Sequence, residues 1–141
     1  MTRNRTALLS LAALLTAATL AACSDQDLGA AVALADGRKL VPAPVESAEI
    51  VVRETAPPEY AVRITSGLPN GCAQFERIDV LANGTVIELK VWNSLPGDEK
   101  TSCTMIYGTT SNTVSLGSTF ETGRTYDVRI NGETKVTFTA Q

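Results

Sequence analysis

Apolar and polar residues alternate with a period of two over much of the chain after residue 47, which is the pattern of half-buried β-strands. In YAVRIT the apolar positions are Tyr60, Val62 and Ile64, and in AEIVVRE they are Ile50 and Val52. The two prolines of the intervening TAPPE favour a connection or an edge break over a central strand. No amphipathic helix is predicted in this part of the chain.

Two asparagine-glycine pairs interrupt the longest alternating runs and predict β-hairpins. Asn83-Gly84 lies within ERIDVLANGTVIELKVW, and Asn131-Gly132 lies within TYDVRINGETKVTFTA. Asn-Gly supplies the two positive-φ positions of a type I′ turn, whose twist matches that of the flanking strands. Between the hairpins, CTMIYG and NTVSLG are shorter strand candidates.

These elements predict an all-β fold: a single antiparallel, immunoglobulin-like β-sandwich of seven or eight strands. Short strands with turn signals every 8 to 12 residues are typical of that architecture. Every aromatic residue lies after residue 59, and aromatic side chains supply much of a small core's buried area. The predicted folded domain therefore spans 47–141.

The segment FETGRTY, Phe120 to Tyr126, resembles the Leu-x-Pro-Gly-x-x-Tyr segment of fibronectin type III domains. The resemblance implies a corner tyrosine, Tyr126, whose hydroxyl bonds back to the backbone a few residues upstream. Thr122 stands where the proline would be, while Gly123 matches. Val128 stands where an antibody-type domain has cysteine, so the resemblance is to a generic immunoglobulin-like sandwich.

More loosely, the combination of GLPNGC, a later cysteine before IYG, and LGSTFETGRTYDVRINGE is similar to C-terminal domains of uncharacterised bacterial lipoproteins. That resemblance spans most of the predicted domain. It implies the fold and carries no activity.

The N-terminus has the pattern of a secretory signal peptide over 1–22. The segment 2–5 is short and basic, and the segment 7–22 is apolar and ends in small residues. A transmembrane helix is the alternative, but it needs about 20 apolar residues, and this shorter run contains Ser10, Thr16 and Thr19.

The sequence Leu20-Ala21-Ala22-Cys23 resembles the lipobox of bacterial lipoproteins. The resemblance implies that the chain is cut before Cys23 and that Cys23 is acylated through its sulfur. Two or three acyl chains hold a protein firmly at a membrane, whereas one is marginal. We therefore expect an extracytoplasmic protein anchored to a cell membrane or outer membrane. The alternative is an ordinary secreted protein with an incidental cysteine.

The choice between inner and outer membrane stays open. By the sorting rule of bacterial lipoproteins, Ser24 after the cysteine does not favour retention at the inner membrane, but Asp25 weakens an assignment to the outer membrane. Residues 23–46 contain no aromatic residue and include Pro-Ala-Pro, so they are predicted to be the lipid anchor and a flexible linker. The predicted organisation is 1–22 signal peptide, 23–46 anchor and linker, and 47–141 sandwich.

The chain has three cysteines, so one of them has no intramolecular partner. With Cys23 as the anchor, Cys72 and Cys103 remain, and two thiols in an exported chain usually pair. The pair would close a loop of about thirty residues, worth about 3 to 4 kcal/mol in the chain-entropy model. A redox role is the alternative, but the pair is neither Cys-x-x-Cys nor flanked by bases.

The net charge is −3, and removal of residues 1–22 lowers Lys+Arg from 12 to 10 against 15 Asp+Glu, giving −5. That acidity argues against nucleic acid as a partner. The chain has no histidine, which excludes Ser-His and Cys-His nucleophile pairs and His-ligated zinc. We expect no enzymatic activity, no cofactor and no metal.

Two further positions stand out as candidate binding residues. Alternation places Trp92 on the face opposite Leu89 and Val91, where it could contact a partner or glycan, unless a bulge turns it into the rim of the core. Asp98-Glu99 lies in a polar loop, but it lacks the Asp-x-Asp-x-Asp-Gly spacing of a calcium site and is predicted to be solvated.

The function predicted from these features is a lipid-anchored binding or structural module of the cell envelope, with an unknown envelope protein or glycan as partner. The first alternative is a protease-inhibitor-like sandwich that uses the loops Ser66 to Gln74 and Asn93 to Ser102. The second is an enzyme that relies on carboxylates. Its candidate residues are all expected at the surface: Glu76, Asp79, Glu88, Glu121 and Asp127.

Overall fold

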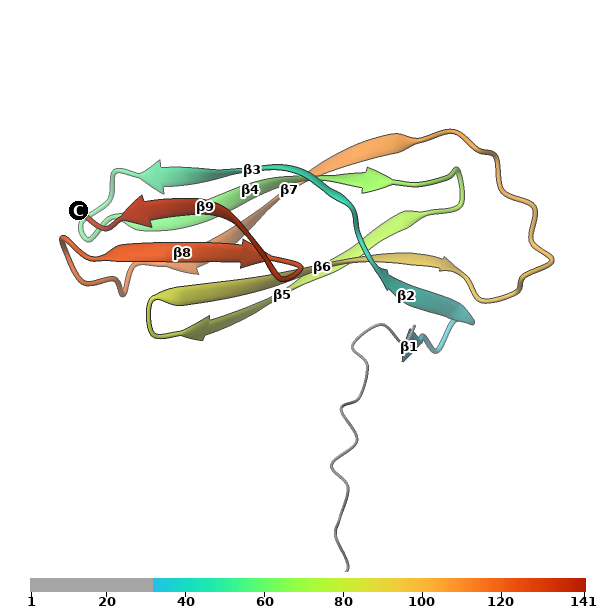
Figure 1. The fold of residues 1–141 in the computed structure, drawn as a ribbon, viewed down its shortest axis with the longest axis horizontal. Helices are drawn as coiled ribbons and strands as arrows, with labels where there is room; N and C mark the ends of the chain where they lie inside the picture. Colours follow the sequence, from blue (N-terminus) through green and yellow to red (C-terminus); the bar gives the residue numbers. More distant parts are fainter. Residues whose placement is uncertain (1–31) are drawn as a thin grey trace, which may run out of the picture.

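The computed structural model describes residues 32–141, which fold into two packed β-sheets (Figure 1). Nine strands form within these residues, so the prediction of an all-β sandwich is confirmed, with more strands than the seven or eight expected. The strands are β1 (Val32–Ala33), β2 (Arg38–Pro42), β3 (Val45–Arg53), β4 (Glu59–Leu68), β5 (Gln74–Asn83), β6 (Val86–Pro96), β7 (Gly108–Gly117), β8 (Thr125–Ile130) and β9 (Glu133–Thr139).

The smaller sheet contains three antiparallel strands in the order β3-β4-β7. The larger sheet is built around β6, the longest strand. One edge of β6 pairs with β5. Its other edge pairs with β2 through Trp92–Pro96 and with β8 through Val86–Leu89, while β1 extends beyond β2 and β9 beyond β8.

The pairing of β6 with β8 is parallel, which differs from the purely antiparallel immunoglobulin-like arrangement expected. After β6 the chain crosses to the smaller sheet, runs back through β7, and returns to the larger sheet as β8 (Figure 1). Because the chain reverses direction twice, β8 runs the same way as β6. The sandwich is therefore antiparallel in all but this pair.

The core lies between the sheets and follows the alternation seen in the sequence. Ile87, Leu89 and Val91 of β6 are each at most 2 % exposed. They pack with the buried apolar residues of β4, β8 and β9. Burial of each large apolar side chain contributes about 1.5 to 3 kcal/mol. These positions therefore supply much of the free energy that holds the two sheets together.

The tyrosine corner expected from FETGRTY is present. The hydroxyl of Tyr126 accepts a hydrogen bond from the backbone N–H of Glu121 at 3.1 Å. Gly123 has a φ of 81°, which explains the glycine at that position. The corner side chain Phe120 contacts Tyr126 edge to face, so the turn into β8 is packed as well as hydrogen-bonded.

One of the two predicted Asn-Gly turns forms as expected. Asn131 and Gly132 both have positive φ, 51° and 88°, as a type I′ turn requires. In the first hairpin the prediction is wrong by one residue: Asn83 pairs with Val86, which leaves a loop of Gly84-Thr85. Gly84, with a φ of 60°, takes the first loop position, as in a type II′ turn.

The boundary predicted for the linker, 23–46, is wrong at its C-terminal end. Arg38–Pro42 forms β2 on the edge of β6, and β3 begins at Val45. Leu40 is 2 % exposed, so this strand contributes to the interior although it contains no aromatic residue. The predicted signal peptide, Cys23 and the chain up to residue 31 lie outside the described residues.

The strand predicted at CTMIYG does not form. Residues 101–107 have no neighbouring strand, and β7 begins only at Gly108, which pairs with Leu68. Met105, Ile106 and Tyr107 are three apolar residues in succession, so they cannot alternate between core and solvent, and all three are exposed.

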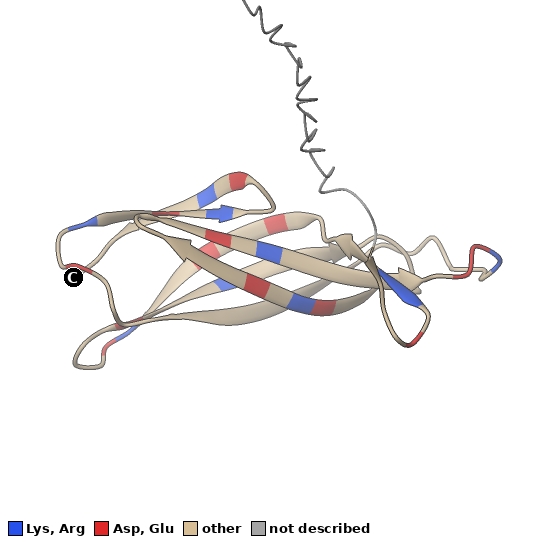
Figure 2. Ribbon diagram, turned by 90° about the horizontal axis from the view of Figure 1, so that it is seen from below, with Lys and Arg blue, Asp and Glu red and all other residues tan. Residues whose placement is uncertain are grey.

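Charged residues are distributed over the outside without one dominant sign. Figure 2 shows acidic and basic positions interspersed along the strands, with both signs at the turn of residues 98–100. The ion pairs are at the surface, for example Arg63 with Glu49 at 2.7 Å, and such pairs contribute little stability. In the part of the chain that the structure describes, no helix is long and apolar enough to cross a membrane.

Candidate functional site

The longest connection in the sandwich joins β6 to β7 and projects from the end opposite the C-terminus (Figure 1). The β1-β2 hairpin reaches the same end, where the backbone N–H of Gly97 donates to the carbonyl of Gly37 at 2.9 Å. The N-terminal side of the domain and this connection therefore share one end of the molecule.

Within this connection, residues 101–107 form an extended, exposed segment, which we call the 101–107 loop. The exposed fractions of Met105, Ile106 and Tyr107 are 88 %, 70 % and 52 %. No residue of the loop has a positive φ, and the chain makes no turn or bend along it. Three large apolar side chains in a row are thus presented to solvent on an extended backbone.

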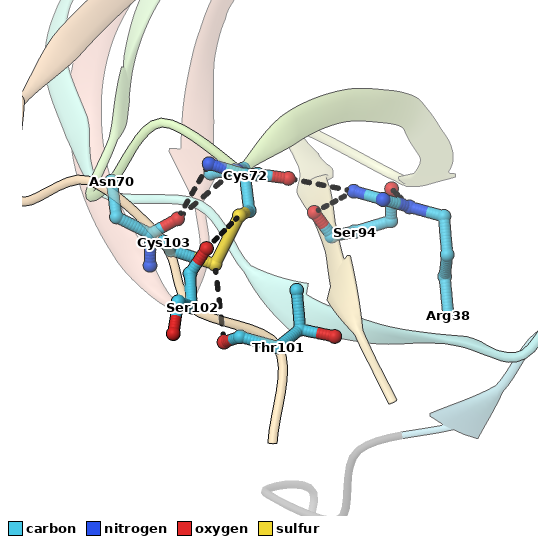
Figure 3. Close-up of a disulfide and its surroundings, with 8 residues drawn as sticks. Arg38, Asn70, Cys72, Ser94, Thr101, Ser102 and Cys103 are labelled. Carbon is cyan, nitrogen blue, oxygen red and sulfur yellow. Dashed lines mark hydrogen bonds between the residues drawn. A yellow bond between two sulfur atoms is a disulfide. The ribbon is translucent and has the colours of Figure 1, made fainter. Parts of the chain in front are cut away.

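A disulfide fixes the N-terminal side of the loop. Cys72 and Cys103 are bonded, with their Cα atoms 5.5 Å apart, which confirms the predicted pairing (Figure 3). Asn70 holds the turn before Cys72, because its Oδ1 accepts from the backbone N–H groups of Cys72 and Ala73, both at 3.0 Å. Cys103 is therefore attached to a turn that is itself held in place.

Arg38 fixes this disulfide to the larger sheet. Its guanidinium donates to the carbonyl of Cys72 at 2.9 Å, and to the carbonyl and hydroxyl of Ser94 at 2.8 and 2.9 Å (Figure 3). Arginine suits this role because its planar fork offers several donors in a fixed geometry. Sequence reasoning missed Arg38 because the residue fell in the predicted linker; the short apolar run Leu40-Val41 next to it was the available signal for a strand.

Thr104 lies against a glycine. The backbone N–H of Gly71 donates to the carbonyl of Thr104 at 2.9 Å. A β-carbon at Gly71 would collide with the Thr104 side chain, so the absence of a side chain at residue 71 allows the close approach.

Tyr107 fixes the C-terminal side of the loop in a similar way. Its phenol lies over Gly67, where a β-carbon would collide with the ring, and its hydroxyl donates to the carboxylate of Glu46. That hydrogen bond raises the pKa of Tyr107, together with some desolvation and the negative charge of Glu46. The buried amide of Asn93 donates to the carbonyl of Gly67 at 2.8 Å, which ties this point of β4 to the other sheet.

Between these two attachments, Met105 and Ile106 project into solvent. The loop offers an extended backbone and two apolar side chains, which are the elements of strand-like peptide recognition. Histidine is absent from the chain, so the loop cannot carry a Ser-His or Cys-His nucleophile pair. The arrangement suits binding.

Trp92 lies on the outer face of the larger sheet and is partly exposed. Val91 and Asn93 on either side of it are buried, as alternation requires. The indole N–H donates to the carboxylate of Asp79 at 2.8 Å, and Asp79 also accepts from Arg77 at 3.0 Å. A contact between Trp92 and a partner stays a prediction.

Two of the candidate carboxylates make separate contacts at the surface. Asp79 is bonded to Trp92 and Arg77, while Glu121 bonds Arg124 at 2.6 Å near the tyrosine corner. Asp98 caps its own turn by accepting from the N–H of Lys100 at 2.9 Å. Among residues 32–141, no three His, Cys, Asp or Glu side chains are grouped so as to hold a metal ion.

The loops predicted for a protease inhibitor begin too early in the sequence. Ser66 to Leu68 is the end of β4, and Asn93 to Pro96 is the end of β6, so both segments are held in sheets. The exposed segments at this end are the turn of residues 69–73 and the connection of residues 97–107. The exposed apolar residues that distinguish the loop were missed because they were assigned to a strand.

Comparison with known proteins places most of this architecture in one family. No curated protein and no solved structure matches the chain. The family match begins in β4 and continues through both hairpins, both cysteines of the disulfide and the 101–107 loop. It spans residues 62–140, and the chain belongs to the ORF11 beta-sandwich domain family.

Proposed function

We propose that this protein is a lipid-anchored, extracytoplasmic binding module of the cell envelope, and that the 101–107 loop is its binding element. Support for the location comes from Leu20-Ala21-Ala22-Cys23 at the end of an apolar run. The Cys72–Cys103 disulfide is consistent with that location, because disulfides persist in oxidising compartments outside the cytoplasm.

The observation that carries the binding role is the succession Met105-Ile106-Tyr107, exposed yet attached on both sides. Contiguous exposed apolar residues mark interaction sites. A segment that is already held in one conformation loses less conformational entropy when it binds. The proposal is a binding role and includes no catalysis.

With Cys23 as the anchor, a short tether would hold this binding element near the membrane. Nine residue steps separate Cys23 from Val32, and a chain of that length reaches at most about 30 Å. Val32 is the first residue of β1, and the β1-β2 hairpin contacts the end of the sandwich from which the loop projects. Because β2 belongs to the fold, this tether is shorter than the twenty-odd residues that the sequence indicated.

Mass spectrometry of the mature protein tests the anchor. The expected mass is that of Cys23 to Gln141 plus a diacylglyceryl group, with or without a third acyl chain, and the protein should partition with membranes. Cys23→Ala should leave the signal uncleaved by the lipoprotein pathway and the acyl mass absent. A mature chain with an unmodified Cys23, or with a cleavage site elsewhere, would contradict the anchor.

Site-specific photocrosslinking in intact cells tests the binding element. A photoreactive residue at position 105 should give a discrete crosslinked product. The same residue at Leu81, an exposed apolar position near the β5-β6 turn, is the matched control and should give none. Equal crosslinking at both positions would contradict a specific role for the loop.

A further inference from the structure

The shape of the 101–107 loop resembles that of a bound protease substrate. Many endopeptidases bind their substrate as an extended peptide. They form hydrogen bonds to the peptide backbone and accept one peptide side chain in a specificity pocket. The loop offers an extended backbone with no strand beside it, and its most exposed apolar side chain, Met105, lies between the two attachments. A protease cleft could therefore approach it without any rearrangement of the sandwich.

We propose that the 101–107 loop is a substrate-like inhibitory segment for an extracellular serine endopeptidase with an apolar specificity pocket, in which Met105 fills the pocket and Met105–Ile106 is the bond presented. The inference deepens the binding role proposed for the loop and rests on that role. It does not depend on the lipid at Cys23.

The composition of the loop defines the class of pocket. No charged residue occurs from Thr101 to Phe120, so a protease with a carboxylate at the base of its pocket would find no basic side chain to bind. Met105 is unbranched and flexible, which suits a deep apolar pocket. Ile106 is branched at its β-carbon and stiff, so it fits such a pocket less well.

The attachments on both sides of the bond distinguish an inhibitor from a substrate. Cys103 is bonded to Cys72, and the Thr104 carbonyl is held by Gly71. On the other side, Tyr107 lies over Gly67 and bonds Glu46, and β7 begins at the next residue. Both halves of a cleaved loop would therefore stay attached next to each other.

That geometry has a direct chemical consequence. The protease serine hydroxyl attacks the Met105 carbonyl carbon, which forms an ester and breaks the Met105–Ile106 bond, and the serine proton passes to the Ile106 nitrogen. Because that amine stays beside the ester, it re-forms the peptide bond and returns the proton to the serine faster than water hydrolyses the ester. The protease then stays occupied.

A bilayer fits the loop less well as an occupant. Asp98, Glu99 and Lys100 precede the loop and together carry one net negative charge, which anionic lipid headgroups repel. Tyr107, the residue best suited to a membrane interface, is turned back onto Gly67 and Glu46.

The test is inhibition of purified chymotrypsin and subtilisin by the full mature chain in detergent, with trypsin as the mismatched protease. We expect inhibition of one or both apolar-pocket enzymes and none of trypsin. Met105→Lys should weaken the apolar-pocket interaction at least about a hundredfold, because a charge would enter an apolar pocket, and should create inhibition of trypsin. Leu81→Lys makes the same change in charge at a distant exposed position and should alter neither.

Three outcomes would overturn the inference: no inhibition of either enzyme, rapid cleavage at Met105–Ile106 with full return of activity, or inhibition that Met105→Lys leaves unchanged. Binding of the full chain to anionic vesicles that requires Met105, without any inhibition, would replace the protease by a membrane surface. These results are independent of the mass at Cys23. If position 105 crosslinks a discrete product while no inhibition is seen, the binding role survives and the protease assignment fails.

Discussion

Tyr107 lies directly over Gly67, and its hydroxyl reaches the carboxylate of Glu46 beyond the glycine. This contact joins the C-terminal side of the 101–107 loop to two strands of the smaller sheet, β3 and β4. It is the counterpart of the disulfide on the other side of the loop. The loop is thus exposed in its side chains but anchored in its backbone, and several predictions test that combination.

Gly67→Ala should displace Tyr107 without unfolding the domain, because the added β-carbon collides with the end of the tyrosine side chain and comes close only to the end of Glu46, both of which can move. Amide hydrogen exchange of residues 104–107 should become faster, while exchange in β6 should stay the same. Gly108→Ala is the control, since a β-carbon there makes ordinary contacts with Leu68. Unchanged exchange in Gly67→Ala would show that Tyr107 does not fix the loop.

Replacement of Cys72 and Cys103 together by serine should lower the free energy of unfolding by about 3 to 4 kcal/mol, given a sequence separation of 31. Urea denaturation of this variant and of the parent protein provides the measurement. The loop should also become a ready substrate for proteases. A loss below about 1 kcal/mol would contradict a stabilising role for the disulfide.

Asn131 should matter for its side chain as well as for its turn. Its Oδ1 accepts from the N–H of Val91 at 3.0 Å, and its Nδ2 donates to the carbonyl of Ala43 at 2.8 Å. Asn131→Gly keeps the positive φ and removes both bonds, so we expect a loss of about 1 to 3 kcal/mol in thermal or urea unfolding. Asn131→Asp keeps only the acceptor and should also destabilise the domain. If Asn131→Gly were as stable as the wild type, the two hydrogen bonds of the Asn131 side chain would not contribute to stability.

Alternation in the sequence was enough to predict the sandwich, the buried face of β6 and the second hairpin, because each depends on local pattern or local turn chemistry. The pairing of Cys72 with Cys103 followed from the count of cysteines in an exported chain. The tyrosine corner was predicted from a short motif whose hydrogen bond spans only five residues.

The candidate site was harder to predict because it depends on contacts between distant segments. Arg38 donates hydrogen bonds to Cys72 and Ser94, and nothing near Arg38 in the sequence indicates either partner. Apolar composition at Met105-Ile106-Tyr107 favoured a strand, whereas a partner strand exists only from Gly108 onward. Apolar residues that face solvent break the rule on which such predictions rest, and such exceptions are expected at functional sites.

The titration of Tyr107 gives a prediction about pH. Its hydrogen bond to Glu46 requires the neutral phenol, and the pKa of Tyr107 is accordingly raised above its ordinary value of about 10. The attachment is therefore fully present below pH 10 and is lost as the pH rises through the raised pKa. The difference in phenolate absorbance between the wild type and Tyr107→Phe reports this titration.

Glu46→Gln serves as the control for that titration. Without the carboxylate charge, the pKa of Tyr107 should move back toward its ordinary value. A Tyr107 that titrates in the wild type at or below its ordinary pKa would contradict the contact with Glu46.

The most direct test of the account is the rate at which chymotrypsin cleaves Met105–Ile106 in the native protein, compared with the same bond in a linear peptide of residues 101–110. If the loop is held as described, the native bond should be cut at least about a hundred times more slowly, because both new ends stay in place and rejoin. The enzyme should meanwhile remain inhibited. Cleavage of both at similar rates would contradict the account, because it would show a loop that is exposed but not held.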